Sequence, residues 1–468
     1  MNKRFLAKLL TIAGLILIMM IPLSMIQVVV SDRTMFREQA KISIANSWTG
    51  RQSFLGPFLV QPYTEYTQAK TWDENLKAYQ IETISSEKQL LILPDELNIK
   101  GDITTEERRR GLYAIPVYNA ALAVQGSFSN QPILNFLKSS ANKVELHKPY
   151  VSLIISDIRG IVTQPVLAWG NQTSEFISGA GLADSSSGMR ADVSVISVTT
   201  PATYAFSFDT HLHGMETLQF SPAGKSTVVD VKSAWLHPSF DGRYLPSERN
   251  IDDNGFTATW RASSFSSNME HVMNQCQFGD CNDLMANTFG VSLIQPVDIY
   301  QQTERSVKYA SLFIVLTFVV FFLFEIMKSM RLHPMHYVLV GASLTLFYLL
   351  LISISEHIDF FWAYVISSLA NIAVISIYIS EVLQSRLRAA AFTGLLLLLY
   401  FMLYVILRSE DNALLMGSLL IFGILSAVMV ITRKLDWYKV AEQISRQTPA
   451  VNNATQAGNR ADSNTQQV

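Results

Sequence analysis

Six apolar segments of membrane-spanning length limit what this chain can fold into. The first covers residues 9–30, and the other five follow one another closely at residues 309–327, 337–354, 361–379, 389–407 and 413–432. A helix rises ~1.5 Å per residue, so each segment reaches about 30 Å, the thickness of a bilayer's hydrocarbon core. The sequence therefore predicts a membrane protein with one N-terminal transmembrane helix, a large domain outside the bilayer and a C-terminal bundle of five transmembrane helices.

We predict four regions along the chain. They are the N-terminus with the first helix (1–30), the outer domain (31–305), the helical bundle (306–437) and a polar tail (438–468). The first apolar segment is longer than that of a signal peptide and lacks an A-x-A-like cleavage site, so we interpret it as an uncleaved anchor. The tail cannot bury enough apolar area to offset the entropy of ordering, so we expect it to be disordered.

The positions of lysine and arginine predict the orientation in the membrane. Basic residues flank the N-terminus, two alternate loops and the end of the last span: Lys3, Arg4, Lys8, Lys328, Arg331, Arg386, Arg388, Arg433, Lys434 and Lys439. All of these positions fall on one side of the bilayer, and such positions favour the cytoplasmic side. We therefore expect both termini in the cytoplasm and the large domain on the opposite side.

The outer domain has the sequence pattern of an α + β domain that consists mainly of antiparallel strands. Around residues 206–213, apolar and polar side chains alternate with a period of two, which is typical of a half-buried strand. Glycine and proline recur between such runs, as expected of turns. We predict an antiparallel sandwich or meander with helical segments near 31–47 and 269–285. The small, polar stretch at 180–191 is a candidate subdomain break.

Composition and motifs exclude several functional classes. The net charge of −2 gives no basic field to attract nucleic acid, so we expect no nucleic-acid partner. The chain contains no P-loop, dinucleotide-binding fingerprint, nucleophile elbow or H-E-x-x-H motif. The sequence therefore predicts no cofactor and no enzymatic activity, and a membrane-embedded hydrolase is the weakest alternative.

Both cysteines, Cys276 and Cys281, lie in the outer domain. In an oxidising compartment they would close a short structural disulfide loop worth about 2 kcal/mol. The alternative is a metal site, but two thiols do not complete a tetrahedral zinc shell. We therefore predict the disulfide.

Asp209, His211 and His213 alternate along one predicted strand and so project to one face, where they could act as metal ligands. The solvent face of a half-buried strand is polar in any case, and this explains the same three residues without a metal. We predict no metal site and retain these residues as weak candidates.

The apolar C-terminal region carries acidic and histidine residues only near the ends of its spans. Glu325, His333 and His336 lie near the predicted cytoplasmic end, whereas Glu356 and His357 lie about 30 Å away at the other end. They therefore cannot form one site. We interpret them as snorkelling or loop-stabilising polar residues at the membrane ends, and a functional role is the alternative.

The middle of the predicted bundle contains uncharged polar residues: Thr345, Ser367, Ser368, Asn371, Thr393 and Tyr400. Such groups make hydrogen bonds between helices, whereas pumps place ionisable groups near the midplane. Ala390 with Gly394, and Gly423 with Ala427, have the small-xxx-small spacing that favours close helix packing.

Several long sequence blocks occur in a fixed order along the chain. In the membrane region they read KYASLFIVLTFVVFFLFE (308–325), LHPMHYVLVG (332–341) and LFYLLLISISEHIDFFWAY (346–364). In the outer domain they read GRQSFLGPFLVQPY (50–63), SDIRGI (156–161), WLHPSFDGRYLP (235–246), GFTATW (255–260) and FGVSLIQPVDIY (289–300). In sequence and in order, these blocks resemble those of the CreD family of inner membrane proteins of Gram-negative bacteria. The stretch 211–220 departs from the family pattern, which argues against a shared metal role for His211 and His213.

This resemblance implies a multi-pass protein of the bacterial inner membrane with a periplasmic domain. It implies a role in cell envelope integrity and stress tolerance, with no catalytic residues to transfer. The expected partners are membrane lipid and an envelope protein, peptidoglycan or lipid ligand. The alternative function is a carrier or extractor that moves a lipid or other hydrophobic molecule between the bundle and the periplasmic domain.

Overall fold

The computed structural model of the chain describes residues 3–73, 78–182, 187–277, 282–294, 299–327, 332–383, 385–408 and 413–433. The chain forms two compact units. One consists of Met1–Met35 with Val297–Val468, and the other is Phe36–Pro296. The long helix α1 (Lys3–Ser47) contributes residues to both units. The predicted polar tail lies outside the described residues.

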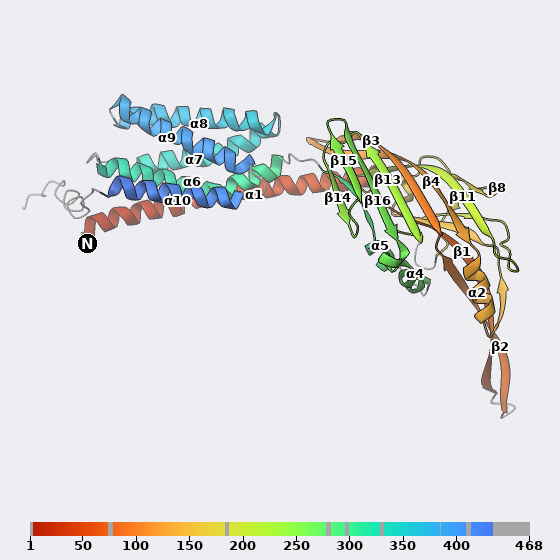
Figure 1. The fold of residues 1–468 in the computed structure, drawn as a ribbon. Helices are drawn as coiled ribbons and strands as arrows, with labels where there is room; N and C mark the ends of the chain where they lie inside the picture. The colour runs from red at the N-terminus through yellow and green to blue at the C-terminus, as the bar shows by residue number, and fades with distance from the viewer. Residues whose placement is uncertain are drawn as a thin grey trace, which may run out of the picture. The chain divides into compact units, whose positions relative to one another are not determined.

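The first unit is a set of apolar helices (Figure 1). After α1 come α6 (Ile299–Met327), α7 (Pro334–Ser355), α8 (Phe360–Leu383), α9 (Arg386–Arg408) and α10 (Ala413–Thr432). Among the described residues, α1 and α6 to α9 are long and apolar enough to cross a membrane, and α10 has a shorter apolar stretch at Leu415–Val430. The predicted N-terminal helix and C-terminal helical bundle are confirmed.

Aromatic side chains fill the core of this helical unit. Phe318, Tyr337 and Phe347 are among its fully buried side chains. At Gly341 of α7, an added Cβ would lie 2.9 Å from the Phe318 ring and 3.0 Å from Met19 of α1. The close approach of α1 and α6 to α7 therefore favours a glycine here, because a larger residue would displace the Phe318 and Met19 side chains. By contrast, a Cβ at Gly394 or Gly423 would meet no atom within 4 Å, so those glycines do not mark close helix contacts.

The second unit consists mainly of two β-sheets (Figure 1). The first sheet contains β1 (Gln52–Asp73), β2 (Ala78–Ile92), β5 (Lys143–Leu146), β6 (Tyr150–Ile155), β9 (Ile177–Ser178), β10 (Gly188–Asp192), β12 (Thr217–Phe220), β14 (Pro238–Gly242) and β17 (Phe289–Leu293). Its main strand order is β14-β17-β12-β1-β6-β10-β9, and β2 and β5 also pair with β1.

The second sheet has the order β15-β16-β13-β3-β4-β11-β7-β8. These strands are β15 (Glu248–Asp252), β16 (Gly255–Ser263), β13 (Ser226–Ser233), β3 (Glu96–Arg110), β4 (Tyr113–Ser129), β11 (Thr203–Met215), β7 (Val166–Trp169) and β8 (Gln172–Glu175). Most neighbouring strands are antiparallel, as the sequence predicts. The pairs β1 with β12 and β3 with β13 are parallel.

Both sheets contribute to one hydrophobic core. Phe54 and Phe58 of β1 and Phe128 and Trp260 of the second sheet are fully buried in it. In β11, Phe206, Phe208, Thr210 and Leu212 are buried, and residues 207, 209 and 211 are exposed. This confirms the half-buried strand predicted from the alternating pattern.

Short helices complete this unit. They are α2 (Gln131–Ser139), the 3₁₀ helix η1 (Ile158–Gly160), α3 (Ser264–Ser267), α4 (Met269–Gln277) and α5 (Asn282–Ala286). Helices α4 and α5 and the C-terminal part of α1 occupy the two segments predicted to be helical. In the stretch 180–191, residues 183–186 lie outside the described residues. The strands on either side of that gap, β9 and β10, pair with each other. The subdomain break stays a prediction.

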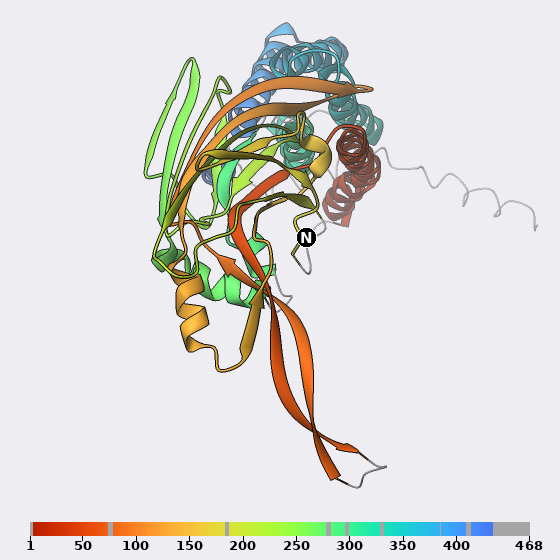
Figure 2. The ribbon, with the colours of Figure 1, turned by 90° about the vertical axis from the view of Figure 1, so that its right-hand side faces the viewer.

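The hairpin of β1 and β2 extends away from the rest of its sheet (Figure 2). Trp72 and Tyr79 form a cross-strand pair near its end, with ring centroids 5.1 Å apart. Both are exposed, at 54% and 69%, and so is Ile81. The hairpin therefore presents apolar and aromatic side chains to the surroundings.

Candidate functional site

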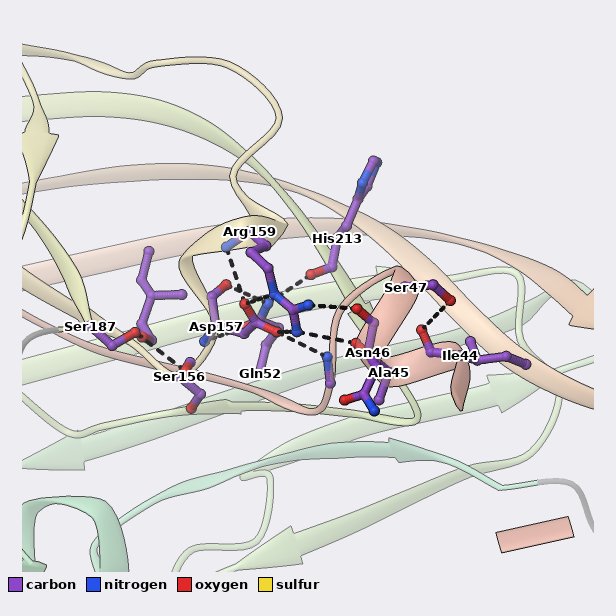
Figure 3. Close-up of polar contacts among 12 residues, drawn as sticks. Ile44, Ala45, Asn46, Ser47, Gln52, Ser156, Asp157, Arg159, Ser187 and His213 are labelled. Atoms are coloured by element: carbon purple, nitrogen blue, oxygen red, sulfur yellow. Dashed lines mark hydrogen bonds and ion pairs between the residues drawn. The ribbon is translucent and has the colours of Figure 1, made fainter. Parts of the chain in front are cut away.

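The C-terminal end of α1 is held by an arginine that follows β6 (Figure 3). The Arg159 guanidinium donates hydrogen bonds to the carbonyl oxygens of Asn46 at 2.7 Å and Ala45 at 3.1 Å. Carbonyls in the last turn of a helix have no partner within the helix, and a cation at that end also interacts favourably with the helix dipole. Arg159 therefore caps α1.

Asp157 orients the capping arginine. Its two carboxylate oxygens accept hydrogen bonds from Arg159 Nε at 2.9 Å and Nη2 at 2.6 Å. A bidentate pair of this kind fixes the plane of the guanidinium. The hydrogen bond from Arg159 is the main reason why the pKa of Asp157 lies below its ordinary value. Both residues belong to the SDIRGI block.

Gln52 of β1 connects this loop to β11. Its side-chain amide donates to the carbonyl oxygens of Asp157 at 3.0 Å and His213 at 2.9 Å, and its Oε1 accepts from the backbone N–H of Asp157 at 3.1 Å. Gly160 lies against this amide. A Cβ at Gly160 would come within 2.4 Å of Gln52 Nε2 and 2.5 Å of the His213 carbonyl oxygen, so this position requires glycine.

Glu216 binds two cations beside the same end of α1. Its carboxylate pairs with Lys41 of α1 at 2.9 Å and with Arg51 at 3.1 Å, and only 16% of its side chain is exposed. Burial acts to raise the pKa of Glu216, but the hydrogen bonds and charges of Lys41 and Arg51 outweigh it, so the pKa lies below the ordinary value. Glu216 is therefore ionised at neutral pH and holds α1 to the β-sheet unit.

Apolar and aromatic contacts complete this junction. Ile44 of α1 packs with Ile115, Val117 and Met215 in a small buried cluster. The ring of Trp48 stacks on His213 at a centroid distance of 4.3 Å, and the Arg108 guanidinium lies 4.1 Å from the Trp48 ring centroid. The end of α1 is thus fixed by ion pairs, a cap and packing together.

The three weak metal candidates lie on β11, as predicted. His213 is half-buried, and burial is the main reason why its pKa lies below the ordinary value. The His213 ring stacks against the Trp48 ring, whereas Asp209 and His211 are exposed. Within the described part of the chain, no group of three His, Cys, Asp or Glu side chains is arranged to hold a metal ion. The structure gives His213 a packing role instead.

Cys276 is buried in α4 and is not a free thiol. Cys281 lies outside the described residues. The disulfide between them stays a prediction.

The junction predicts a pH dependence of stability. Because the folded-state pKa of Glu216 is lowered, its contribution is fully present above about pH 4.5 and is lost as the pH falls through the folded-state value. Replacing Glu216 with glutamine is expected to cost about 2 kcal/mol at neutral pH, since hydrogen bonds to a charged group are lost. As the pH is lowered below about 5, the melting temperature of the full-length Glu216→Gln variant should therefore fall less steeply than that of the full-length wild type.

Glu248→Gln is the matched control for this measurement, because Glu248 is 73% exposed and lies 3.6 Å from Arg261 at the surface. Its melting curve should follow the wild type at every pH. Parallel pH profiles for Glu216→Gln and the wild type would contradict the assignment.

In the helical unit, Glu325 near the end of α6 is a buried carboxylate with several partners. It is 3% exposed and forms an ion pair with Lys8 of α1. It also accepts hydrogen bonds from the Leu332 N–H and the Tyr337 hydroxyl, each at 3.0 Å. A buried charge is stable only when it is paired and hydrogen-bonded, and Glu325 meets both conditions.

A second ion pair joins α1 to the other end of α7. Arg33 Nε lies 3.3 Å from Oε1 of Glu356, which caps α7 and is 9% exposed. Lys8 and Arg33 are separated along α1 by about 38 Å at the rise of an α-helix, which is close to a full bilayer thickness. The two acidic residues at the membrane ends therefore fasten the same helix at two distant points.

The three histidines contribute local contacts. His333 precedes α7 and its side chain accepts from the Met335 N–H at 3.3 Å. His336 Nδ1 and the Tyr378 hydroxyl of α8 are 2.6 Å apart. His357 follows α7, and its backbone N–H donates to Ile354. Glu325, His333 and His336 lie at one end of α7, and Glu356 and His357 lie at the other.

Of the six polar residues predicted to bond helix to helix in the middle of the bundle, Asn371, Thr393 and Tyr400 do so. Thr345 and Ser368 instead donate to carbonyl oxygens of their own helices, and the Ser367 hydroxyl is buried without a hydrogen bond. The amide of Asn371 in α8 donates to Ser343 of α7, and the Tyr400 hydroxyl of α9 donates to Asn371 at 3.1 Å. Thr393 of α9 donates to Ser376 of α8 at 2.7 Å. These bonds connect three successive helices.

Sequence reasoning found Glu325 and Glu356 but missed their partners. Lys8 served only as an orientation signal, and Arg33 lies in a segment predicted to be helical without further assignment. The sequence did contain a signal: Lys8 and Arg33 stand near the two ends of the first span. Glu325 and Glu356 stand near opposite ends of the later spans. Nothing in the local pattern shows which charges meet.

The chain is similar to a protein family and to a curated relative over most of its length. The profile of the family described as "Inner membrane protein CreD" matches residues 4–438. A curated protein of Escherichia coli (strain K12), named "Inner membrane protein CreD", is 32% identical over 438 residues, which cover 92% of this chain and 93% of the relative.

Among solved structures, an M1 zinc metallopeptidase of Deinococcus radiodurans is 9% identical, with a TM-score of 0.17 over 36% of this chain and 38% of that chain. A mutant of that enzyme gives a TM-score of 0.19 over the same shares. Similarity at this level carries no argument about fold or activity.

Proposed function

Because the chain belongs to the CreD family of inner membrane proteins, we propose that it supports cell envelope integrity and stress tolerance through its β-sheet domain, without catalysing a reaction. It spans the membrane with several apolar helices. We propose that the β-sheet domain lies in the periplasm and that both termini lie in the cytoplasm. The distribution of basic residues supports this orientation.

One observation carries the proposal: charged residues in both units are used to fasten α1. Lys8 and Arg33 pair with Glu325 and Glu356 in the helical unit. In the β-sheet unit, Arg159 caps the end of α1 and Glu216 pairs with Lys41. These charged groups hold one helix at four positions. This use supports a structural role for the protein more than a catalytic one.

Exposed side chains on the strands of the β1–β2 hairpin support a contact role for the β-sheet domain. Trp72, Tyr79 and Ile81 project from a strand pair that extends away from the sheet. Exposed aromatic residues of this kind mark contact surfaces. We propose that the domain contacts an envelope component, either a protein, peptidoglycan or lipid.

Complementation tests the proposal. In a strain that lacks the gene, the wild-type chain should restore growth in detergent or another envelope stress. Arg159→Glu should fail to do so at an equal level of membrane protein, because it removes the cap of α1 and places an acidic group at the negative end of the helix. Growth is compared at protein levels matched by immunoblot.

Arg261→Glu is the matched control, because Arg261 is 58% exposed, as Arg159 is 53% exposed, and pairs only with a surface glutamate among the described residues. It should complement fully. A gene deletion that leaves stress tolerance unchanged would refute the proposed function outright.

A carrier or extractor of a hydrophobic molecule is the second candidate function. An apolar groove of about 780 Å³ in the helical unit favours it. The carrier hypothesis predicts that the molecule leaves the groove for the β-sheet domain, and a transfer assay with labelled lipid would test this step.

A further inference from the structure

Helices α6, α9 and α10 form an apolar groove in the helical unit. One face of each helix lines it, through residues such as Leu316, Leu395, Met402, Leu419 and Ile424, and every lining side chain is apolar. Its volume of about 780 Å³ is within the range of sites that hold a small ligand.

The length of the groove fits a lipid chain. On α9 the lining runs from Ala391 to Ile406, a rise of about 22 Å. This exceeds the ~15 Å depth of hydrocarbon in one leaflet. Leu398, Met402 and Leu419 line the groove and remain 39% to 55% exposed. For helices that cross a bilayer, this exposed surface meets acyl chains.

Arginines lie at one end of this groove. Arg388 is one helical turn from Ala391 on the same face of α9, and Arg433 directly follows α10, whose residue Val428 lines the groove. The short connection between α9 and α10 makes them antiparallel neighbours, so these two positions fall at the same end. Helix α9 ends at Arg408, at the opposite end, and two acidic residues, Glu410 and Asp411, come soon after it in the sequence.

We propose that this groove is a binding site for an anionic phospholipid. An acyl chain lies along α6, α9 and α10, and the phosphate lies at the end that carries Arg388 and Arg433. Arginine binds phosphate through several N–H groups at once, and basic positions beside transmembrane helices select anionic head groups. This proposal concerns only the binding of the lipid. A test of it is therefore independent of the carrier hypothesis and of the role in the envelope.

Gly423 allows a direct test, because it lines the groove and a Cβ there would meet no atom within 4 Å. Gly423→Phe should therefore fill the groove without a clash inside the bundle. Gly394→Phe is the matched control, since Gly394 on α9 is equally open but does not line the groove.

The measurement is native mass spectrometry of the full chain in micelles that contain equal amounts of phosphatidylglycerol and phosphatidylethanolamine with identical acyl chains. The wild type and Gly394→Phe should retain mainly phosphatidylglycerol. Gly423→Phe should lose both lipids. The double variant Arg388→Gln/Arg433→Gln should lose the preference for the anionic lipid, with affinity falling about fivefold per arginine.

Arg408→Gln, at the other end of α9, should leave the preference unchanged. Equal retention of the two lipids by the wild type would overturn the proposal, because it would show apolar filling without head-group recognition. Retained phosphatidylglycerol in Gly423→Phe, or a larger loss in Arg408→Gln than in the double variant, would overturn it as well.

Discussion

Replacing Lys8 with methionine is expected to destabilise the helical unit by about 3 kcal/mol, because it leaves the Glu325 carboxylate buried without a counter-charge. Glu325 is 3% exposed, so water cannot compensate, and its hydrogen bonds from Leu332 and Tyr337 remain but do not neutralise it. Thermal unfolding of the full chain in detergent, followed by tryptophan fluorescence, measures the loss as a drop of roughly 10 °C in melting temperature.

The double variant Lys8→Met/Glu325→Gln should recover most of this loss, because no charge is left buried. The single carbonyl oxygen of the glutamine can accept from the Leu332 N–H, and its amide N–H can donate to the Tyr337 hydroxyl. Lys232→Met is the control, since Lys232 pairs with Asp102 at an exposed surface site and should change stability by less than about 1 kcal/mol. Equal losses in the single and double variants would show that the ion pair does not stabilise this helix contact.

Replacing Gly160 with alanine is expected to destabilise the β-sheet unit by about 3 kcal/mol. The added Cβ would lie 2.5 Å from the His213 carbonyl oxygen, a backbone atom that moves only with β11, and 2.4 Å from Gln52 Nε2. Overpacking of this kind costs about 1 to 3 kcal/mol, and the hydrogen bonds of Gln52 are strained as well. Urea unfolding of the full chain measures the change.

Gly50→Ala is the matched control, because Gly50 lies two residues before Gln52 and a Cβ there would meet no atom within 4 Å. It should leave the unfolding midpoint nearly unchanged. Hydrogen exchange at Asp157, whose N–H donates to Gln52, gives a second readout. Unchanged protection and midpoint in Gly160→Ala would refute the tight contact.

Local pattern was enough to predict individual elements. The period-two run at 206–213 predicts β11 because each residue's burial in a strand depends on its own side of the sheet. The three residues of η1, Ile158–Gly160, have no such pattern. Its role as the cap of α1 depends on Arg159 meeting carbonyls more than a hundred residues earlier in the chain.

Strand partners were harder to predict than strands. The antiparallel pairing of β1 with β2 joins neighbours in sequence, whereas the parallel pairing of β1 with β12 joins segments far apart. Periodicity records which face of a strand is buried and carries no information about which strand lies beside it. The sequence therefore predicted the class of the domain correctly, but it made no prediction of the strand order.

The sequence by itself determined the membrane spans, the β-rich domain between them and the family, because apolar length, alternation and ordered blocks are all written along the chain. Only the tertiary structure decided that Lys8 meets Glu325, that Arg33 meets Glu356 and that Gly423 faces open space while Gly341 is enclosed. The physical reason is that pairing energies and free volume depend on distances between residues that folding brings together, and no local pattern encodes those distances.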